Sequence, residues 1–436
     1  MKTLGKLMAA GIFVVAALQL IRPAIPAKPE TAKVALPSDV QKILEKNCYS
    51  CHSNQRRLSW FDEIVPGYWL VRHDILTARE HLNFSTFGSK PAAAQKATLF
   101  EAVNFMRLGA MPLGDFVALH PEAKVSPEEL ATFEVYLAPS ATASELVPPE
   151  KAFAPDAFAK VLPEHNGLPF DPTFVNWKVL STTDRSDNFT VRFILGNDIA
   201  VQAARTGNIS PWPDGTRFAK IAWHRSAADD GLMYPFGFVQ VELMVKDADK
   251  FKKTEGWGWG RWRGVDLKPY GKDADFAKEC TSCHQPVKGN DFVYTLPITE
   301  AKVPGKEVVN NLAAAMPAGM PNNPLSWNAI TMYVDPKMHT TATLFGNDAA
   351  VHSAKSSAYP PGATLALVTW NQREDPHWFG ARIPAAVEYV EFVMVSDAEP
   401  KLGNRRFTAS GEDSPAPGDT RYRVGFITGL APAQLP

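Results

Sequence analysis

Residues 195–198 read Leu-Gly-Asn-Asp and residues 345–348 read Phe-Gly-Asn-Asp, and each is followed by an alanine-rich helical pattern. Further matches extend outward from both stretches at a nearly constant offset: Asn176-Trp177 matches Ser326-Trp327, the turn at 213–216 matches the turn at 360–363, and Leu243–Ala248 matches Val393–Ala398. Because the matches keep their order along the chain, we infer two related segments in tandem.

Alternating and β-branched runs accompany each Gly-Asn-Asp, at 217–223, 238–245, 364–370 and 387–395. Such runs predict mainly antiparallel sheet, with one helix after each Gly-Asn-Asp. Asn197 or Asp198 is suited to cap the first of these helices, and Gly207 is suited to end it. We interpret Gly-Asn-Asp as a helix cap and nothing more.

Only the first segment continues into a cysteine motif. Residues 280–284 read Cys-Thr-Ser-Cys-His, residues 48–52 read Cys-Tyr-Ser-Cys-His, and the two copies hold all four cysteines of the chain. On a helical turn, residues three apart share a face, so both thiols of a copy can reach one porphyrin. This spacing is the attachment signature of c-type haem. It predicts two covalently bound haems, with Cys48, Cys51, Cys280 and Cys283 as attachment sites and His52 and His284 as axial ligands.

Two other uses of the cysteines stay open. They are a redox Cys-x-x-Cys pair and a zinc site that the four cysteines share. Neither use requires a histidine directly after the second cysteine in both copies. The histidines therefore favour haem.

The composition excludes several classes of protein. The chain has 436 residues, of which 45% are hydrophobic and 21% charged, and its formal net charge is −1. This much apolar material supports two or three cores and excludes a disordered, collagen-like or coiled-coil chain. The balanced charge gives no electrostatic reason to expect nucleic acid or an anionic membrane surface as a partner. Small molecules and other proteins are the expected partners.

The N-terminus carries the pattern of an export signal. Lys2 and Lys6 precede an apolar run from Leu7 to Leu20. We expect export to a bacterial periplasm, because c-type haem is attached there. The run is too short for a typical membrane span. Whether the segment is cleaved or kept as an N-terminal anchor stays open.

The first cysteine motif lies in a region with a helical pattern. Ser38 is suited to cap a helix that leads to Cys48, and a second periodic run covers 92–107. A capping box with Pro at the first helical position, at 126–129, opens a helix that continues through Leu137. These patterns predict a small all-helical cytochrome c-like domain.

A haem that carries electrons on this motif needs a sixth ligand. We favour Met111, which lies between helices, because a thioether raises the reduction potential relative to a second histidine. Met106 is the competitor, but it lies inside an apolar helical pattern. The runner-up ligands are His73, His81 and His120.

The sequence thus predicts an α+β multidomain chain, with a small all-α domain followed by two tandem antiparallel-β-rich domains. The predicted parts are a signal peptide or anchor at 1–27, a helical haem-binding domain at 28–140, a linker at 141–160, a haem-bearing β-rich domain at 161–300, a linker at 301–322 and a haemless repeat at 323–436.

Motifs of the first β-rich segment, taken in order, resemble the cytochrome P-460 family. They are Trp-Pro-Asp-Gly-Thr at 212–216, Lys220 and Trp223 on the next strand, Gly-Trp-Gly at 256–258, the second cysteine motif, and Asp-Phe-Val-Tyr-Thr at 291–295. The N-terminal region is similar to the short haem-binding domains of exported multihaem proteins, through residues 48–52, Trp60, Trp69, residues 109–112 and His120-Pro121.

The P-460 resemblance implies a β-rich haem domain in which His284 lies on one side of the iron and an open or exchangeable site on the other. Members of the family oxidise hydroxylamine or bind nitric oxide, and the enzymes among them carry a lysine joined covalently to the porphyrin edge. The resemblance makes Lys220 the candidate for that lysine and for a catalytic residue. It also implies homodimerisation through the sheet-rich domains.

The haemless copy offers an internal comparison for Lys220. Alternation along 217–223 places Phe218, Lys220 and Ala222 on one face, and the equivalent residues of the second copy are Leu365, Leu367 and Thr369. The lysine is thus missing where the cysteine motif is missing. A lysine beside the haem and a solvated lysine both stay open.

Other polar residues near the motif are weaker candidates. We place His224 on the face opposite Lys220 and favour a hydrogen-bonded histidine at a strand end over a sixth ligand or a proton carrier. A distal carboxylate is expected in an oxidation that removes protons from its substrate. Asp273, Asp275 and Glu279 are candidates for it, although helix-start and solvent-facing roles explain them equally well.

These features lead to one functional hypothesis and two rivals. The hypothesis is an exported dihaem cytochrome that oxidises a small nitrogen compound, hydroxylamine or nitric oxide, and passes electrons through the N-terminal haem to a soluble redox partner. The first rival is a non-catalytic cytochrome that binds nitric oxide or transfers electrons. The second is a dihaem peroxidase, which the β-rich repeat does not favour.

Overall fold

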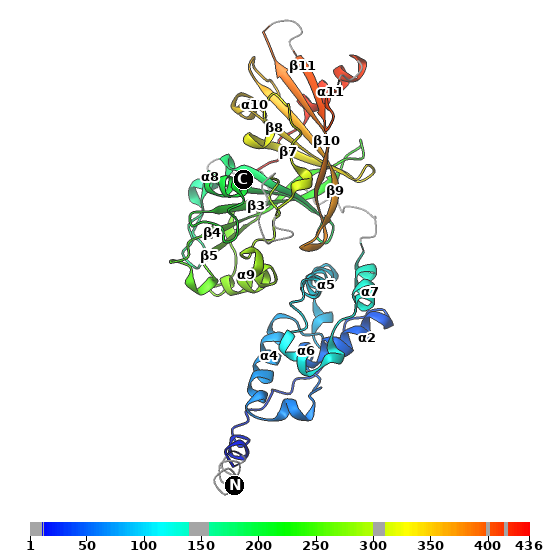
Figure 1. The fold of residues 1–436 in the computed structure, drawn as a ribbon, viewed down its shortest axis with the longest axis vertical. Coiled ribbons are helices and arrows are strands. Elements are labelled where there is room, and N and C mark those ends of the chain that lie inside the picture. The colour runs from blue at the N-terminus through cyan, green and yellow to red at the C-terminus, as the bar shows by residue number, and fades with distance from the viewer. Residues whose placement is uncertain (1–10, 12, 139–156, 300–309, 398–401, 414–416) are drawn as a thin grey trace. The chain divides into compact units, whose positions relative to one another are not determined.

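The protein, in a computed structural model, consists of two compact units that divide after Ala138 (Figure 1). The structure describes residues 11, 13–138, 157–299, 310–397, 402–413 and 417–436. The leader predicted at 1–27 and the linkers predicted at 141–160 and 301–322 lie partly outside these ranges. Within them, no helix is long and apolar enough to cross a membrane.

The N-terminal unit is helical. Its α-helices are α2 (Ser38–Asn47), α3 (Tyr49–His52), α4 (Gly67–His81), α5 (Ala92–Arg107), α6 (Gly114–Leu119) and α7 (Pro127–Leu137). The predicted capping box is confirmed, because Ser126 Oγ accepts from the Glu129 N–H at 3.2 Å and the Glu129 carboxylate accepts from the Ser126 N–H at 2.9 Å. The predicted cap at Ser38 is wrong. Pro37 occupies the cap position of α2 and makes no side-chain cap, and the Asp39 carboxylate accepts from the Val40 N–H at 2.9 Å instead.

The C-terminal unit repeats one arrangement, in which two hairpins flank a short helix. The first copy contains β1 (Lys178–Arg185), β2 (Thr190–Gly196), α8 (Asp198–Thr206), β3 (Arg217–Ala227), β4 (Met233–Lys246), β5 (Trp257–Arg263), β6 (Lys268–Pro269) and α9 (Phe276–His284). The second contains β7 (Asn328–Asp335), β8 (Thr340–Gly346), α10 (Asp348–Ser353), β9 (Thr364–Asp375), β10 (Trp378–Val395), β11 (Leu402–Thr408), β12 (Gly411–Asp413) and α11 (Pro417–Gly429).

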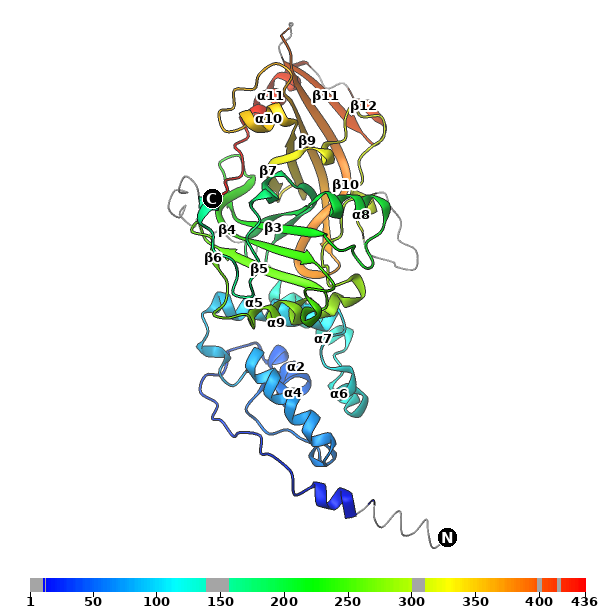
Figure 2. The same ribbon diagram turned by 90° about the vertical axis from the view of Figure 1, so that its left-hand side faces the viewer.

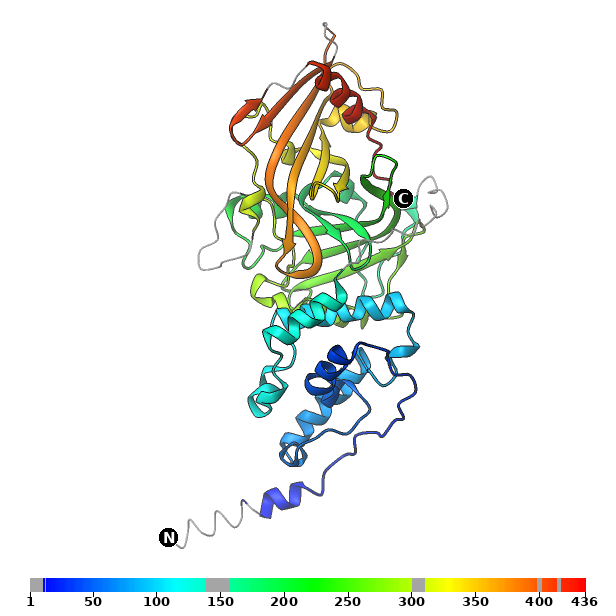
Figure 3. The same ribbon diagram turned by 90° about the vertical axis from the view of Figure 1, so that its right-hand side faces the viewer.

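The strands of both copies form one antiparallel sheet. It runs in the order β1-β2-β3-β4-β7-β8-β9-β10, with β11 and β12 beyond β10 and β5 and β6 beside β4 (Figure 3). Met233 of β4 pairs with Val334 of β7, and Arg185 of β1 pairs with Ala381 of β10. Since β1 also pairs with β10, eight of these strands close on themselves as a barrel.

The two Gly-Asn-Asp stretches adopt the same geometry. The side chain of Asn197 accepts from the Ala200 N–H at 3.0 Å, and Asn347 accepts from the Ala350 N–H at 3.0 Å. Asparagine, rather than the aspartate after it, is therefore the cap. The preceding glycines also have a packing role, because a Cβ at Gly196 would lie 2.9 Å from that of Ala200.

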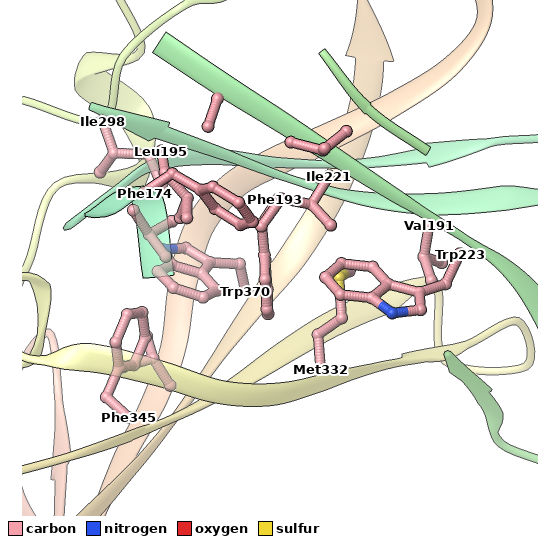
Figure 4. Packing of buried hydrophobic residues seen from close by; sticks show 14 of the residues in the cluster. Phe174, Val191, Phe193, Leu195, Ile221, Trp223, Ile298, Met332, Phe345 and Trp370 are labelled. Carbon is pink, nitrogen blue, oxygen red and sulfur yellow. The ribbon is translucent and has the colours of Figure 1, made fainter. Parts of the chain in front are cut away.

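The barrel interior is filled by side chains from both copies. Phe193 and Trp223 of the first copy pack in one cluster with Met332, Phe345 and Trp370 of the second (Figure 4). The indole of Trp223 donates to the Gln434 carbonyl at 2.6 Å, so it is both packed and hydrogen-bonded. The two repeats therefore share one core, which matching them along the sequence does not reveal.

Alternation along β3 divides its side chains between two layers, as predicted. Ala219, Ile221 and Trp223 face the shared core, whereas Phe218 belongs to a second cluster on the outer face of the barrel. Helix α9 packs on that outer face beside β5 (Figure 2). In the second copy, α11 covers the corresponding outer face over β9, β10 and β11.

Strand register corrects one of the sequence matches. Lys220 pairs with Glu242 across β3 and β4, and Leu367 pairs with Glu391 across β9 and β10. Glu391 is therefore the counterpart of Glu242, an offset of 149 that follows from their registers. The sequence match of 243–248 with 393–398 is therefore shifted by one residue from the match that the strand registers give. The reason is that the amino-acid identities align the turns after the two strands and not the paired residues within them.

In the second copy, the outer face is closed by apolar packing and one ion pair. Val424 and Ile427 of α11 pack against Leu367. The guanidinium of Arg423 meets the carboxylate of Glu391 at 3.1 and 2.5 Å, and the Glu391 side chain is only 1% exposed. A buried carboxylate needs such a partner, because its desolvation is otherwise uncompensated.

We expect Arg423→Met to lower the free energy of unfolding by about 3–5 kcal/mol, because the Glu391 carboxylate would stay buried without its main partner. Urea unfolding followed by tryptophan fluorescence measures the change. The control is Arg405→Met. Arg405 pairs with Glu412 on the surface, and that loss should cost about 0.2–1 kcal/mol. Equal effects of the two substitutions would contradict the argument.

Candidate functional site

Helix α9 carries the second cysteine motif as predicted. Cys280 and Cys283 are three residues apart on this helix, and His284 is its last residue. His284 Nδ1 lies 2.6 Å from the Phe292 carbonyl. Since a carbonyl only accepts, Nδ1 must carry the proton, which leaves Nε2 unprotonated and able to bind a metal. Burial lowers the pKa of His284 to about 4, so the ring is neutral, as an axial ligand must be.

The carbonyl that orients His284 lies in a tight turn. Asp291 and Phe292 both have left-handed backbone conformations, with φ of 49° and 64°, which non-glycine residues adopt only when their surroundings hold them. The Asp291 carboxylate forms an ion pair with the Lys246 ammonium at 2.8 Å and accepts from the backbone N–H of Trp212 at 2.9 Å. Both contacts fix the turn to the first repeat.

Aromatic rings surround the His284 ring. Its centroid lies 4.6 Å from that of Trp259 and 5.0 Å from that of Tyr294. The Tyr294 hydroxyl donates to the Cys283 carbonyl at 2.7 Å, so Tyr294 contacts two residues of the motif. The indole nitrogens of Trp257 and Trp259 are buried without a hydrogen-bond partner among the described residues.

A row of residues crosses the same outer face. Register aligns Ile194, Lys220, Glu242 and Arg261 side by side on β2, β3, β4 and β5. The Glu242 carboxylate forms an ion pair with Lys220 and another with Arg261, the latter at 3.1 Å. Burial raises the pKa of Glu242, but the charges of Arg261 and Lys220 outweigh it and hold the pKa well below its ordinary value.

Lys220 is the sequence-predicted residue in this row. Its side chain is 29% exposed. Burial lowers its pKa to about 8, although Glu242 opposes the shift. The ammonium and the carboxylate therefore hold each other in the charged form, and a modest change around Lys220 would release its proton. A lysine in that balance can serve as a nucleophile.

Arg192 adds a further cation to this face. Its side chain is buried, with 8% exposure, and its Nε donates to Thr190 Oγ1 at 3.1 Å. No carboxylate of the described residues pairs with its guanidinium, and burial lowers its pKa to about 9. Lys220, Arg192 and Arg261 thus face one carboxylate, so two positive charges are left over. A porphyrin with two carboxylates, such as haem, fits this surplus.

The second repeat lacks the same two cations. By strand register, Ala342 replaces Arg192 and Leu367 replaces Lys220, whereas Glu391 and Arg406 keep the places of Glu242 and Arg261. There Arg423 pairs with Glu391 and Arg406 lies 3.6 Å from the Asp413 carboxylate, so the surplus charge is missing from the copy that has no cysteine motif. The comparison predicted from the sequence for Lys220 therefore extends to Arg192.

The structure also places the other polar candidates of the first repeat. The predicted face of His224 is wrong, because the regular β2–β3 register pairs it with Thr190 and Lys220 with Ile194, an even separation that puts both on one face. Asp273, Asp275 and Glu279 are exposed, and Glu279 accepts from the Tyr270 hydroxyl at 3.0 Å.

The carboxylate beside Lys220 is Glu242, which sequence reasoning missed together with Arg192. Glu242 lies in a strand whose neighbouring residues, Val241 and Leu243, are apolar and buried. The signal in the sequence was a charged residue between two apolar residues of a predicted strand. Its partner could not be identified without the register of the sheet.

The histidine of the first cysteine motif is oriented by a backbone carbonyl, as His284 is. Cys48 precedes α3, while Cys51 and His52 lie on it. His52 Nδ1 lies 2.9 Å from the Leu82 carbonyl, which again leaves Nε2 free of a proton. Burial lowers the pKa of His52 and raises that of the Cys48 thiol to about 12. A redox dithiol needs a lowered pKa, so this environment does not favour the redox alternative.

The three histidines considered as sixth ligands in this unit differ in their surroundings. Both ring nitrogens of His120 face carboxylates, with Asp62 at 2.9 Å and Glu122 at 3.2 Å, so His120 is held as a structural residue. His73 and His81 are exposed. Met111 is half-buried in the segment after α5, and Met106 is half-buried within α5. Met111 as the ligand stays a prediction.

Comparison with known families agrees with this division of the chain. A family model described as Cytochrome P460 matches residues 172–295, and one described as a haem-binding domain matches residues 12–138. No curated protein matches the chain. The first match covers β1 to α9 and the turn at Asp291, and the second covers the helical unit. The matches therefore support a haem cytochrome in which residues 12–138 are similar to a haem-binding domain and residues 172–295 are similar to cytochrome P460.

Proposed function

We propose that this protein is an exported, periplasmic dihaem cytochrome that oxidises a small nitrogen compound, hydroxylamine or nitric oxide. One haem would be attached at Cys48 and Cys51 and the other at Cys280 and Cys283. Electrons would pass from the second haem to the first and then to a soluble redox partner. The observation that carries the proposal is the half-buried Lys220–Glu242 ion pair on the outer face against which α9 packs.

The two motifs support covalent attachment in the same way. Each brings two thiols within one helical turn and ends on a histidine whose Nδ1 bonds to a carbonyl. A neutral imidazole held this way is the usual form of a metal-ligating histidine. The haem at Cys280 would supply the redox centre at which the substrate loses electrons.

The chain's own residues account for the proton chemistry. Oxidation of a substrate with N–H or O–H bonds releases protons, and a base within reach speeds that release. Glu242 is ionised because Arg261 and Lys220 lie beside it. Attachment of Lys220 to the porphyrin would remove one of these charges, which would make the Glu242 carboxylate a stronger base, able to accept a proton at Oε1 or Oε2. Lys220 would bind the porphyrin edge, as the family resemblance implies, and Arg192 would balance porphyrin carboxylates.

Removal of one attachment cysteine should remove one haem. The wild-type protein should contain two covalent haems per chain, and Cys280→Ala and Cys48→Ala should each contain one. The pyridine haemochrome assay, with mass spectrometry of the intact chain, counts them. One haem in the wild-type protein would refute the dihaem proposal.

Lys220→Leu, which copies Leu367 of the second repeat, should abolish hydroxylamine oxidation and leave the haem count at two. The reduced absorption spectrum of the wild-type protein should contain a second, strongly red-shifted haem band that the variant lacks. The matched control is Lys268→Leu, since Lys268 is exposed. If the variant retains turnover, Lys220 is not the catalytic lysine. If the wild-type protein binds nitric oxide but releases no electrons from hydroxylamine, it is a binding protein.

Glu242→Gln should lower kcat for hydroxylamine by about 10²–10⁴-fold, because an amide cannot accept the proton. Haem content and the spectrum should stay unchanged, since glutamine keeps the shape and a hydrogen-bond acceptor. Steady-state electron transfer to an artificial acceptor measures kcat, and Glu279→Gln serves as an exposed carboxylate control. An unchanged kcat would exclude Glu242 as the base.

A further inference from the structure

The haemless repeat reaches the histidine side of the second motif. The turn between β9 and β10 brings His377 Nδ1 within 2.7 Å of the Tyr294 carbonyl. Because a carbonyl only accepts, His377 donates this bond. Next to it, the Trp378 ring packs edge-on against the Tyr294 ring at 5.5 Å. Two consecutive residues of the second repeat thus contact the segment that follows the cysteine motif of the first.

The turn that carries His377 and Trp378 is itself held by the barrel. The Asp375 carboxylate accepts from the His377 N–H at 2.8 Å. The Arg185 guanidinium lies 4.1 Å from the centre of the Trp378 ring, and Arg185 pairs with Asp187. Arg185 also belongs to β1, which pairs with β10. The position of the turn is therefore fixed by the closure of the barrel.

Tyr294 connects this turn to His284. Its ring contacts the His284 ring, and its hydroxyl bonds to the Cys283 carbonyl. It also lies two residues after Phe292, whose carbonyl accepts from His284 Nδ1. The segment is thus held from both sides, by Lys246 and Trp212 of the first repeat at Asp291 and by the second repeat at Tyr294.

We propose that the haemless repeat sets the reduction potential of the haem at Cys280, with His377 and Trp378 as positioning residues that hold the Phe292 carbonyl against His284. This inference rests on the proposed haem attachment and on His284 as its ligand. A firm bond from Nδ1 to a carbonyl makes the imidazole a stronger electron donor, which stabilises the oxidised iron. Loss of the His377 contact loosens the segment and weakens that bond.

The test is the midpoint potential of each haem in the full-length protein, measured by spectroelectrochemistry. His377→Ala should shift the potential of the Cys280 haem to more positive values and leave that of the Cys48 haem unchanged. Resonance Raman of the reduced protein should show a lower iron–histidine stretching frequency for the Cys280 haem. His377→Asn, whose amide nitrogen can replace the Nδ1 donor, should restore both values.

Two further variants distinguish a positioning role of His377 from a general effect on the stability of the protein. His352→Ala removes an exposed histidine of the same repeat and should leave both potentials unchanged. Trp378→Leu should shift only the Cys280 haem, in the same direction as His377→Ala. Unchanged potentials in folded His377→Ala with both haems attached would overturn this inference and leave the proposed function standing. Equal shifts of both haems, or loss of the folded barrel, would also overturn it. A wild-type chain without haem at Cys280 would instead refute the proposed function.

Discussion

Closure of the sheet is the constraint on which the rest of the C-terminal unit depends. Four strands of one repeat alone would leave β1 and β4, or β7 and β10, with unpaired backbone groups along their edges. Pairing β4 with β7 and β1 with β10 covers part of these edges, and β5 and β11 pair with other parts of β4 and β10. The closure also turns the inner faces of both repeats toward each other. Phe193 and Phe345 then share one core inside the barrel, and each repeat adds a smaller buried cluster on its own outer face.

A filled interior leaves the outer faces for chemistry, and the two repeats use them differently. Each has a carboxylate at the same register position, the half-buried Glu242 or the buried Glu391. In the second repeat the neutralising cation comes from α11 as Arg423, and leucine packs beside it. In the first, Lys220 and Arg261 neutralise the carboxylate and Arg192 adds more positive charge. The two faces thus share the carboxylate and differ in the cations around it.

The same closure gives the haemless repeat a place beside the histidine of the other. Because β10 pairs with β1, the turn before it is held next to Arg185 and extends to Tyr294. The contact joins residues far apart in the sequence, and it needs no haem in the second repeat. The repeat without a cysteine motif thus contacts the segment that orients the histidine of its neighbour.

The sequence by itself determined the two cysteine motifs, the capping box at Ser126, a helix after each Gly-Asn-Asp, and the alternation that places Lys220 on the same face as Phe218. Each of these depends on contacts within a few residues, which local spacing encodes. Only the tertiary structure decided that the repeats form one barrel, that Glu242 lies beside Lys220, and that His377 reaches Tyr294. These depend on strand register and on closure, where a shift of one residue changes the face of every side chain. The amino-acid sequence of a segment does not determine this register, as the one-residue error in matching 243–248 shows.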